Sequence, residues 1–159
     1  MNKLQYSESK TLKLTNVLKY KINLADEDFN FRAELEKMQS YIKTNGAVQI
    51  GPLIQYTNPN IINDVGELDI DITLMMQANN FIHNVQAPYR MESLLRVPGC
   101  MYCRYIGPEE KLKLAIDKIN IEAFEKNEEL NGDSYTIFIS ENEAEETMVA
   151  DIFMPRKKR

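Results

Sequence analysis

One order of segments occurs twice in this chain. Each half begins with a β-rich run, continues with an amphipathic helical stretch that an Asn-Gly pair ends, and closes with two more strand-like runs. In the first half these segments are Lys10–Leu24, Asp26–Thr44, Asn45-Gly46, Val48–Thr57 and Glu67–Met76. In the second half they are Glu92–Ile106, Pro108–Glu129, Asn131-Gly132, Ser134–Ser140 and Glu146–Pro155. A tandem βαββ pair predicts two units related by a pseudo-twofold axis, with a groove where they meet.

The repeat predicts a single domain with an α+β fold over the whole chain, residues 1–159. Copy one covers about residues 10–76, a linker covers 77–90, copy two covers about 91–155, and 156–159 form a basic tail. Helical stretches that alternate with strand pairs favour a mostly antiparallel sheet with both long helices on one face.

Two amphipathic stripes mark the predicted helices. We expect the first helix to begin at Asp26, because an N-cap aspartate and an acidic first turn suit the helix dipole, and to end at Asn45-Gly46. The second should begin at Pro108 and end at Asn131-Gly132. The apolar residues recur at helical spacing and predict one buried stripe on each helix. The stripes are Phe31, Leu35, Met38 and Ile42, and then Leu112, Ala115, Ile116, Ile119 and Ala123.

Two strands can be assigned to faces from their patterns. In Glu67–Met76 apolar residues alternate with acidic residues and threonine, so one face should be buried and the face that holds Asp69, Asp71 and Thr73 should be solvated. Tyr135–Ile139 is continuously bulky, which is typical of a strand covered on both faces.

Composition and charge restrict the partners. Hydrophobic residues make up 43% and charged residues 27% of the sequence, as in ordinary globular domains. The chain has neither a leader nor a membrane-length apolar run, so we expect a cytoplasmic protein without membrane contact. A net charge of −5 argues against direct nucleic-acid binding. Met1–Ser9 is too short for a helix-turn-helix, and the basic tail Arg156–Arg159 should be solvated.

Cys100 and Cys103 form a CxxC motif that has three interpretations. A redox motif needs its first cysteine at a helix N-terminus, but this pair lies within a predicted strand, where residues three apart point to opposite faces. A zinc site needs four ligands, and the chain offers no second CxxC and a single histidine, His83. We therefore expect structural cysteines and no metal.

A series of short motifs in the second half resembles a known family. The series is Val97-Pro98-Gly99, Tyr105-Ile106-Gly107, Pro108-Glu109-Glu110, Asn131-Gly132, Ser134-Tyr135-Thr136-Ile137-Phe138 and Glu145–Pro155. Its order resembles the gyrase-inhibitor-like, or bacterial effector-binding, domain family, which includes the ligand-sensing half of multidrug-responsive transcription activators. The resemblance covers nearly the whole chain when Gly46–Tyr56 and Gly66–Met76 are taken as the matching parts of copy one.

The resemblance implies two βαββ modules around a groove that binds small apolar or cationic molecules. An aromatic and aliphatic wall with few polar groups is what such a groove needs, although core packing gives the same pattern. By position, the implied ligand-binding residues are Pro52, Ile54 and Tyr56 from copy one and Tyr105, Leu112, Tyr135, Thr136 and Phe138 from copy two.

One position departs from the family. Its drug-sensing members have a buried carboxylate after the aromatic residue of the first strand that follows the second helix, and this carboxylate pairs with the ligand's positive charge. Here Thr136 follows Tyr135. A hydroxyl cannot neutralise a cation, so we do not expect binding of cationic drugs in that manner.

Three functions remain open at the level of sequence. The leading one is a stand-alone, non-catalytic binding domain for a small hydrophobic ligand, with no cofactor. The alternative is a protein-interaction or inhibitor module whose acidic cluster Glu141–Glu146 faces a basic partner. Catalysis is less favoured, because Thr136 stands where an acid is needed and His83 lies in the linker without a partner motif. The scattered glycines form no phosphate-binding loop.

Overall fold

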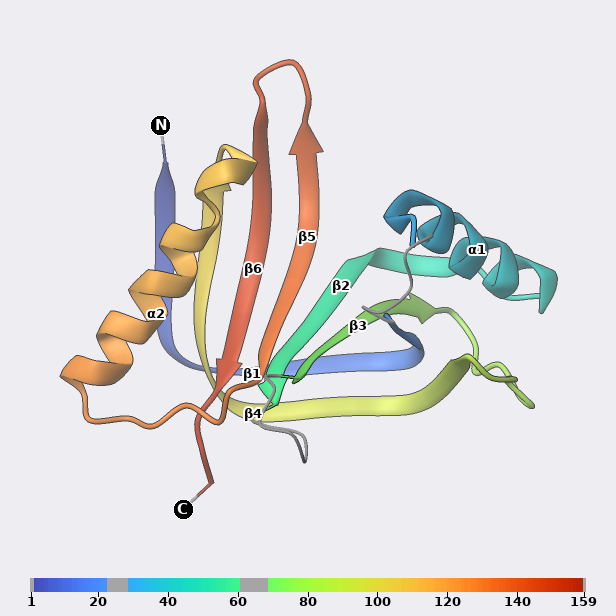
Figure 1. Cartoon of the computed structure of the whole chain (residues 1–159), viewed down its shortest axis with the longest axis horizontal. Coiled ribbons are helices and arrows are strands. Elements are labelled where there is room, and N and C mark those ends of the chain that lie inside the picture. Colours follow the sequence, from blue (N-terminus) through green and yellow to red (C-terminus); the bar gives the residue numbers. More distant parts are fainter. Residues whose placement is uncertain (1, 23–28, 61–68, 159) are drawn as a thin grey trace.

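The computed structural model describes residues 2–22, 29–60 and 69–158, and over them the elements alternate as strand, helix, strand, strand and then again (Figure 1). A 3-10 turn, η1 (Glu109–Lys111), precedes the second helix. The elements are β1 (Lys3–Lys21), α1 (Phe31–Thr44), β2 (Gln49–Asn60), β3 (Asp69–Ala78), β4 (Tyr89–Gly107), α2 (Lys113–Glu125), β5 (Ser134–Asn142) and β6 (Thr147–Pro155).

The six strands form one closed antiparallel barrel in the order β1-β3-β2-β5-β6-β4. Two strands, β1 and β4, are 19 residues long and pair with each other from Lys3↔Ile106 to Tyr20↔Tyr89. Both bend, so that one half of each strand lies beside α2 and the other half lies below α1 (Figure 1). β5 pairs with β2 only over Ser134–Ile137, and beyond that point the β5–β6 hairpin projects upwards.

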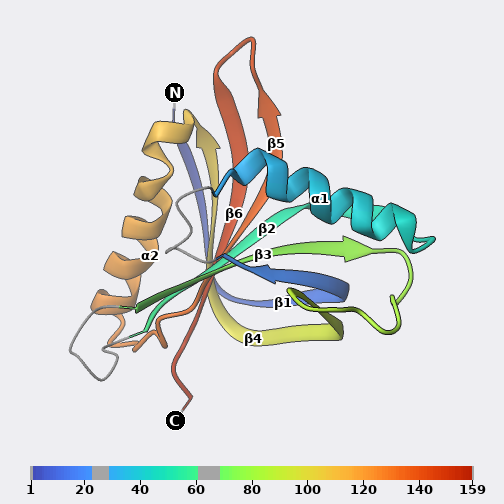
Figure 2. The same ribbon diagram turned by 45° about the vertical axis from the view of Figure 1, so that its right-hand side comes forward.

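Neighbouring residues of one strand point to opposite faces of the sheet and pack in different hydrophobic clusters. On β4, Met101 and Cys103 pack in a cluster with Ile119 of α2, whereas Cys100 and Tyr102 belong to a cluster that includes no helix residue. α1 covers a third cluster, in which Met38 and Ile42 are buried. Both helices therefore cover the outside of the barrel, as Figure 2 also shows. The helix-free cluster, here called the inner cluster, consists of Leu12, Leu14, Val17, Ile54, Met75, Cys100, Tyr102, Tyr135 and Phe153.

The first helix starts later than the sequence suggested. Its N-cap is Asn30, whose side-chain oxygen accepts a hydrogen bond from the Ala33 amide at 3.1 Å. The expected start at Asp26 lies outside the described residues. Phe31, at the first helical position, is 42% exposed and does not join the buried stripe. The predicted end at Asn45-Gly46 is confirmed, because Asn45 is the C-cap and Gly46 has a positive φ of 78°.

The second helix is shorter than predicted at both ends, because Pro108 is extended, η1 follows it and α2 begins only at Lys113. Its buried stripe is confirmed. Ala115, Ile119 and Ala123 are buried. The helix ends at Glu125 rather than near Asn131, because Asn127 adopts the left-handed conformation with φ 53° that terminates helices. Asn131 instead donates its amide to the Pro155 carbonyl at 3.0 Å, in the turn that leads into β5.

The β3 face that was expected to be solvated points into the barrel, where Thr73 is buried and Asp71 is half-buried. Thr73 is only 4% exposed, and its hydroxyl donates to Asp71 Oδ1 at 2.9 Å. Glu67 and Leu68 lie outside the described residues, as does the side chain of Asp69. On β5, Ile139 is 39% exposed, so the bulky run is not covered on both faces along its whole length.

The C-terminal basic segment is anchored rather than solvated at its first residue. Arg156 donates to the carbonyl of Glu8 at 2.5 Å and to that of Gly99 at 3.3 Å, and it forms an ion pair with Glu128. These contacts tie the end of β6 to β1 and β4. No helix among the described residues is long and apolar enough to span a membrane.

We expect Asn30→Ala to lower the free energy of unfolding by about 1 kcal/mol, because it leaves the Ala33 amide without its cap. Asn30→Asp keeps an acceptor at the same place and should retain most of the stability. Urea denaturation of both variants and the wild type measures this difference. Equal stability of Asn30→Ala and the wild type would contradict the assigned cap.

Candidate functional site

A row of aromatic side chains crosses four strands on the inner face of the barrel. Tyr56 pairs with Tyr135, Tyr135 with Phe153, and Phe153 with Tyr102 in the strand register. The ring centroids of Tyr56 and Tyr135 are 5.0 Å apart, and so are those of Tyr102 and Phe153. Neighbouring strands lie about 4.8 Å apart, which allows each ring to contact the next across the sheet.

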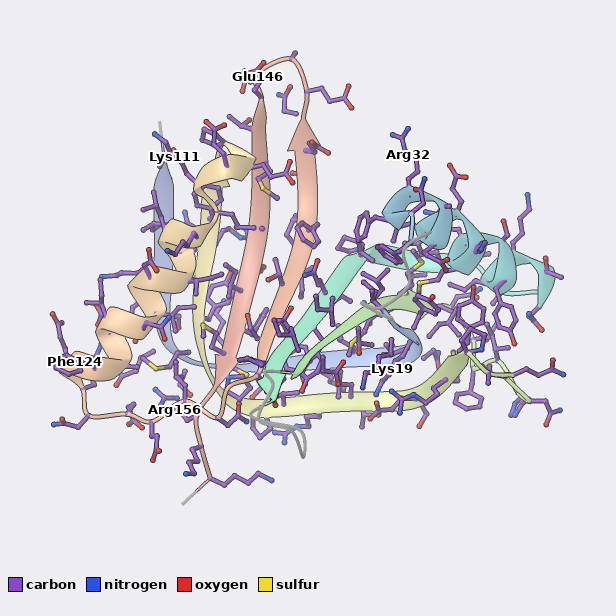
Figure 3. The ribbon with its side chains drawn as sticks, viewed as in Figure 1. Lys19, Arg32, Lys111, Phe124, Glu146 and Arg156 are labelled. Atoms are coloured by element: carbon purple, nitrogen blue, oxygen red, sulfur yellow. The ribbon has the colours of Figure 1, made fainter. Side chains whose placement is uncertain are left out.

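A cleft of about 230 Å³ opens at the Tyr56 end of this row. Tyr56, Tyr135, Met75 and Leu95 give it an aromatic and aliphatic floor, and its polar residues are Lys19, Asp71, Thr73 and Arg90. Figure 3 labels Lys19, which lies on the half of β1 below α1. Polar or charged residues and apolar or aromatic residues line the cleft in equal number, and its volume is below about 300 Å³, the usual lower limit of small-molecule sites. This inner cleft suits a ligand of one or two rings.

The phenol of Tyr56 is held by a polar pair beside the cleft. Its hydroxyl donates to Asp133 Oδ1 at 2.7 Å, and Asn58 Nδ2 donates to the same oxygen at 2.5 Å. Burial, followed by the hydrogen bond to Asp133, raises the pKa of Tyr56 to about 12. Burial also raises the pKa of Tyr135. Both phenols are therefore neutral near pH 7.

A buried carboxylate lies on the same inner face. Asp151 of β6 is 7% exposed. Tyr102 donates its hydroxyl to Asp151 Oδ1 at 2.8 Å, and Arg104 binds both carboxylate oxygens, with Nε–Oδ1 and Nη2–Oδ2 distances of 2.7 and 3.0 Å. The hydrogen bond to Asp151 raises the pKa of the Arg104 guanidinium. Burial, together with Asp151, raises the pKa of Tyr102 to about 12.

Sequence reasoning did not find Asp151. The sequence comparison with the family expected a carboxylate at position 136, where this chain has Thr136. Thr136 is half-buried, pairs with Gln55 and Ile152, and lies on the β5 face opposite to Tyr135. A signal was present: within the apolar run Met148–Pro155, Asp151 is the only ionisable residue. A charged residue in the middle of a buried strand requires a partner and thus marks a site of interest.

The structure places six of the eight predicted ligand-binding residues in or against two clusters, and Pro52 and Thr136 in neither. Ile54, Tyr56 and Tyr135 meet in or against the inner cluster. The Tyr105 hydroxyl instead donates to the Pro108 carbonyl at 2.5 Å beneath α2, on the opposite side of the sheet. Half-buried Pro52 lies where the β2 register shifts between Ile50 and Ile54. Of the predicted ligand-binding residues, three pack in or against the cluster under α2, namely Tyr105, Leu112 and Phe138. The predicted eight therefore do not surround one groove.

The two cysteines are buried, unpaired with each other and on opposite faces of β4, as the strand period predicts. Burial raises the pKa of the Cys100 thiol to about 11 and also raises that of Cys103. Both changes disfavour the reactive thiolate. Among the described residues, no group of histidine, cysteine, aspartate or glutamate side chains could hold a metal ion.

A larger hollow, of about 680 Å³, lies between η1 and the β5–β6 hairpin and is strongly acidic. Figure 3 places Glu146 at the upper tip of this hairpin and Arg156 at the lower end of the molecule, so the acidic loop lies far from the basic tail. The glutamates that line the hollow are Glu109, Glu110, Glu141, Glu143 and Glu146.

Comparisons identify the fold through solved structures. No family model and no curated protein matches the chain. The C-terminal domain of EcmrR aligns at 15% identity and a TM-score of 0.65, covering 97% of this chain and 99% of that domain. EcmrR bound to DNA aligns at 16% identity and a TM-score of 0.65, covering 98% of this chain, which spans 58% of the EcmrR length. A hydrolase encoded by lin2189 from Listeria innocua aligns at 11% identity and a TM-score of 0.58, with 98% and 91% coverage. At these identities the likeness shows a shared fold.

Alkaline titration should reveal the buried phenols. An unfolded tyrosine ionises near pH 10, whereas Tyr56 and Tyr102 do so near pH 12 in the folded chain. Their contribution to stability is complete below about pH 10 and is lost as the pH rises towards 12. At about pH 11, adding urea should therefore raise phenolate absorbance. The rise should be smaller in Tyr56→Phe and Tyr102→Phe, and an unchanged rise in both would contradict the assigned environments.

Both thiols should resist modification in the folded protein, because each is buried and its thiolate is disfavoured. We expect a thiol reagent at mildly alkaline pH to label neither cysteine in the native state and both in urea. Mass spectrometry of the labelled chain measures this. Rapid native labelling of Cys100 would instead restore the redox interpretation of the CxxC motif.

Proposed function

We propose that this chain is a non-catalytic effector-binding domain that holds a small molecule with an apolar body in the inner cleft. The observation that carries the proposal is the aromatic floor of this cleft, formed by Tyr56 and Tyr135 on the inner face of a closed barrel. The ring of a ligand can stack or pack edge-on against these side chains. Thr73 and the charged residues around the cleft would orient its polar end.

The fold supports this assignment. The motifs of the second half resemble the gyrase-inhibitor-like, or bacterial effector-binding, family, and the chain shares its fold with the C-terminal domain of EcmrR over almost its full length. EcmrR forms a complex with DNA. On this basis we propose that the chain is a bacterial, cytoplasmic member of that family, and that any effect on transcription requires a DNA-binding partner or segment.

We also propose that the two βαββ units are related by a pseudo-twofold axis. The repeated element order supports this proposal, as does the antiparallel pairing of the equally long β1 and β4. Such an axis would pass between β1 and β4 and would relate α1 to α2. An experimental structure in which Lys3–Ala78 and Tyr89–Pro155 fail to superpose by a half-turn would contradict it.

Binding can be tested with two leucines that differ in their location. Leu95 lies in the inner cleft, and Leu112 packs beneath α2. We expect Leu95→Ala to weaken the binding of 1-methylnaphthalene about fivefold or more, because it removes apolar contact area from the ligand. Leu112→Ala should leave the affinity within about twofold while also lowering stability.

Isothermal titration calorimetry of the two leucine variants and the wild type measures these affinities. Equal loss of binding in both variants would argue against the inner cleft. No binding by the wild type across neutral, anionic and cationic aromatic probes would contradict the proposed function itself. Catalysis would be indicated by turnover of an electrophilic aromatic substrate that disappears in Tyr135→Phe.

One observation favours the alternative function, a module that captures a partner protein. Five glutamates around the 680 Å³ hollow concentrate negative charge beside the hairpin tip. Such a surface would attract a basic partner and speed its association. Replacing Glu143, Glu145 and Glu146 by glutamine should then abolish capture of a basic partner, while 1-methylnaphthalene binding stays as in the wild type. Unchanged capture would exclude an electrostatic role for this loop.

A further inference from the structure

The inner face holds the two features that an organic cation needs in a protein site. A cation that leaves water requires a countercharge, and Asp151 is a carboxylate buried on this face. A cation is also attracted to the face of an aromatic ring, and Tyr102 presents its ring two strands away from Tyr135 along the aromatic row. Tyr56 and Tyr135 line the inner cleft, and Phe153 lies between Tyr135 and Tyr102 in the strand register.

The countercharge is already neutralised within the chain. Arg104 binds both oxygens of Asp151, and Tyr102 donates a third hydrogen bond to the same carboxylate. A bidentate arginine–carboxylate pair is among the strongest charge-assisted contacts in proteins. A ligand cation would have to displace Arg104, whose side chain is tethered and already in place.

The aromatic face is also occupied. Lys10 of β1 places its ammonium 4.1 Å from the centroid of the Tyr102 ring. Lys10 is exposed and pairs with Cys100 at the point where the β1 register is irregular. Its cation therefore covers Tyr102 from the solvent side, in the position where a ligand cation would stack.

The charged groups at the inner cleft nearly balance one another. Its lining includes two cations, Lys19 and Arg90, and one carboxylate, Asp71. Lys19 also forms an ion pair with Glu92. With Lys19 paired, Arg90 is the lining cation that can donate to an anionic group on a ligand, and Asp71 offsets part of its charge.

We propose that Arg104 and Lys10 act as internal counter-ligands that exclude organic cations from this face, so that the effector is an uncharged or anionic aromatic molecule. This inference rests on the proposed function and deepens it by naming the ligand class. Arg104 and Lys10 are then specificity-determining residues, and their removal exposes a latent cation site.

The test uses three probes of nearly one shape that differ in charge. These are 1-methylnaphthalene, 1-methylquinolinium and 1-naphthoate, titrated by calorimetry into the full chain. The wild type should bind the neutral or the anionic probe at least about tenfold more tightly than the cation. If 1-methylnaphthalene binds more tightly than 1-naphthoate, the effector is uncharged, and the reverse order makes it anionic. Wild-type affinity for 1-methylquinolinium that equals its affinity for 1-methylnaphthalene would overturn the proposal.

Three variants then separate the two counter-ligands. Arg104→Met frees the Asp151 carboxylate, and Lys10→Met uncovers Tyr102. Each should raise the affinity for 1-methylquinolinium, by about tenfold for Arg104→Met and about threefold for Lys10→Met, with little change for 1-methylnaphthalene. The matched control, Arg104→Met with Asp151→Asn, removes both charges and should not gain cation binding. A gain in this control equal to that of Arg104→Met would contradict the role of Asp151.

Failure of the Arg104→Met variant to fold and failure of the wild type to bind any probe have different consequences. If Arg104→Met does not fold, as judged by circular dichroism, Lys10→Met decides the inference, because Lys10 is exposed and its loss leaves the Asp151 pair intact. No gain in that variant would then overturn the inference. If the wild type binds none of the three probes, the proposed function fails, yet a gain of cation binding in the variants would still support the latent site.

Discussion

The antiparallel pairing of β1 with β4 is the constraint on which the rest of the structure depends. These two strands run together from Lys3↔Ile106 to Tyr20↔Tyr89, and the rest of the barrel is built from the two halves of this ribbon. β3 continues the sheet from one half of β1, and β6 continues it from the opposite half of β4. The bend of the two strands brings the two sheet halves around a shared inner face, and β2 and β5 close the barrel.

This geometry places the residues that pack beneath the helices and the candidate ligand-binding residues on opposite faces of the sheet. Residues that point outward from the barrel, such as Met101 and Leu74, are covered by helices and belong to ordinary cores. Residues that point inward meet no helix, so aromatic rings and charged groups share that face. A closed barrel tolerates Asp151 there because Arg104 and Tyr102 provide hydrogen bonds to its carboxylate. The ionisable groups of the candidate site thus follow from topology as much as from composition.

Local signals in the sequence predicted where helices and strands lie better than they predicted which face of each strand is covered by a helix. The end of α1 at Asn45 and the buried stripe of α2 depend on neighbouring residues, and both are confirmed. The end of α2 was misplaced, because Asn127 adopts the left-handed conformation without a following glycine. The period of two separates Tyr135 from Thr136, but it does not say which face a helix covers. That choice depends on strand register between distant segments, which is why Asp151 was missed and Thr136 was overvalued.

The upper part of the β5–β6 hairpin carries carboxylates whose role differs from that of the charged groups on the inner face. β5 leaves β2 after Ile137, so among the described strands only β6 pairs with its outer residues. A strand edge of this kind is a template on which another chain can add. Glu141 lies on this edge, and Glu143 and Glu146 lie at the hairpin tip. Because like charges repel across a newly formed strand pair, these carboxylates disfavour edge-to-edge growth between copies and help to keep the domain from aggregating.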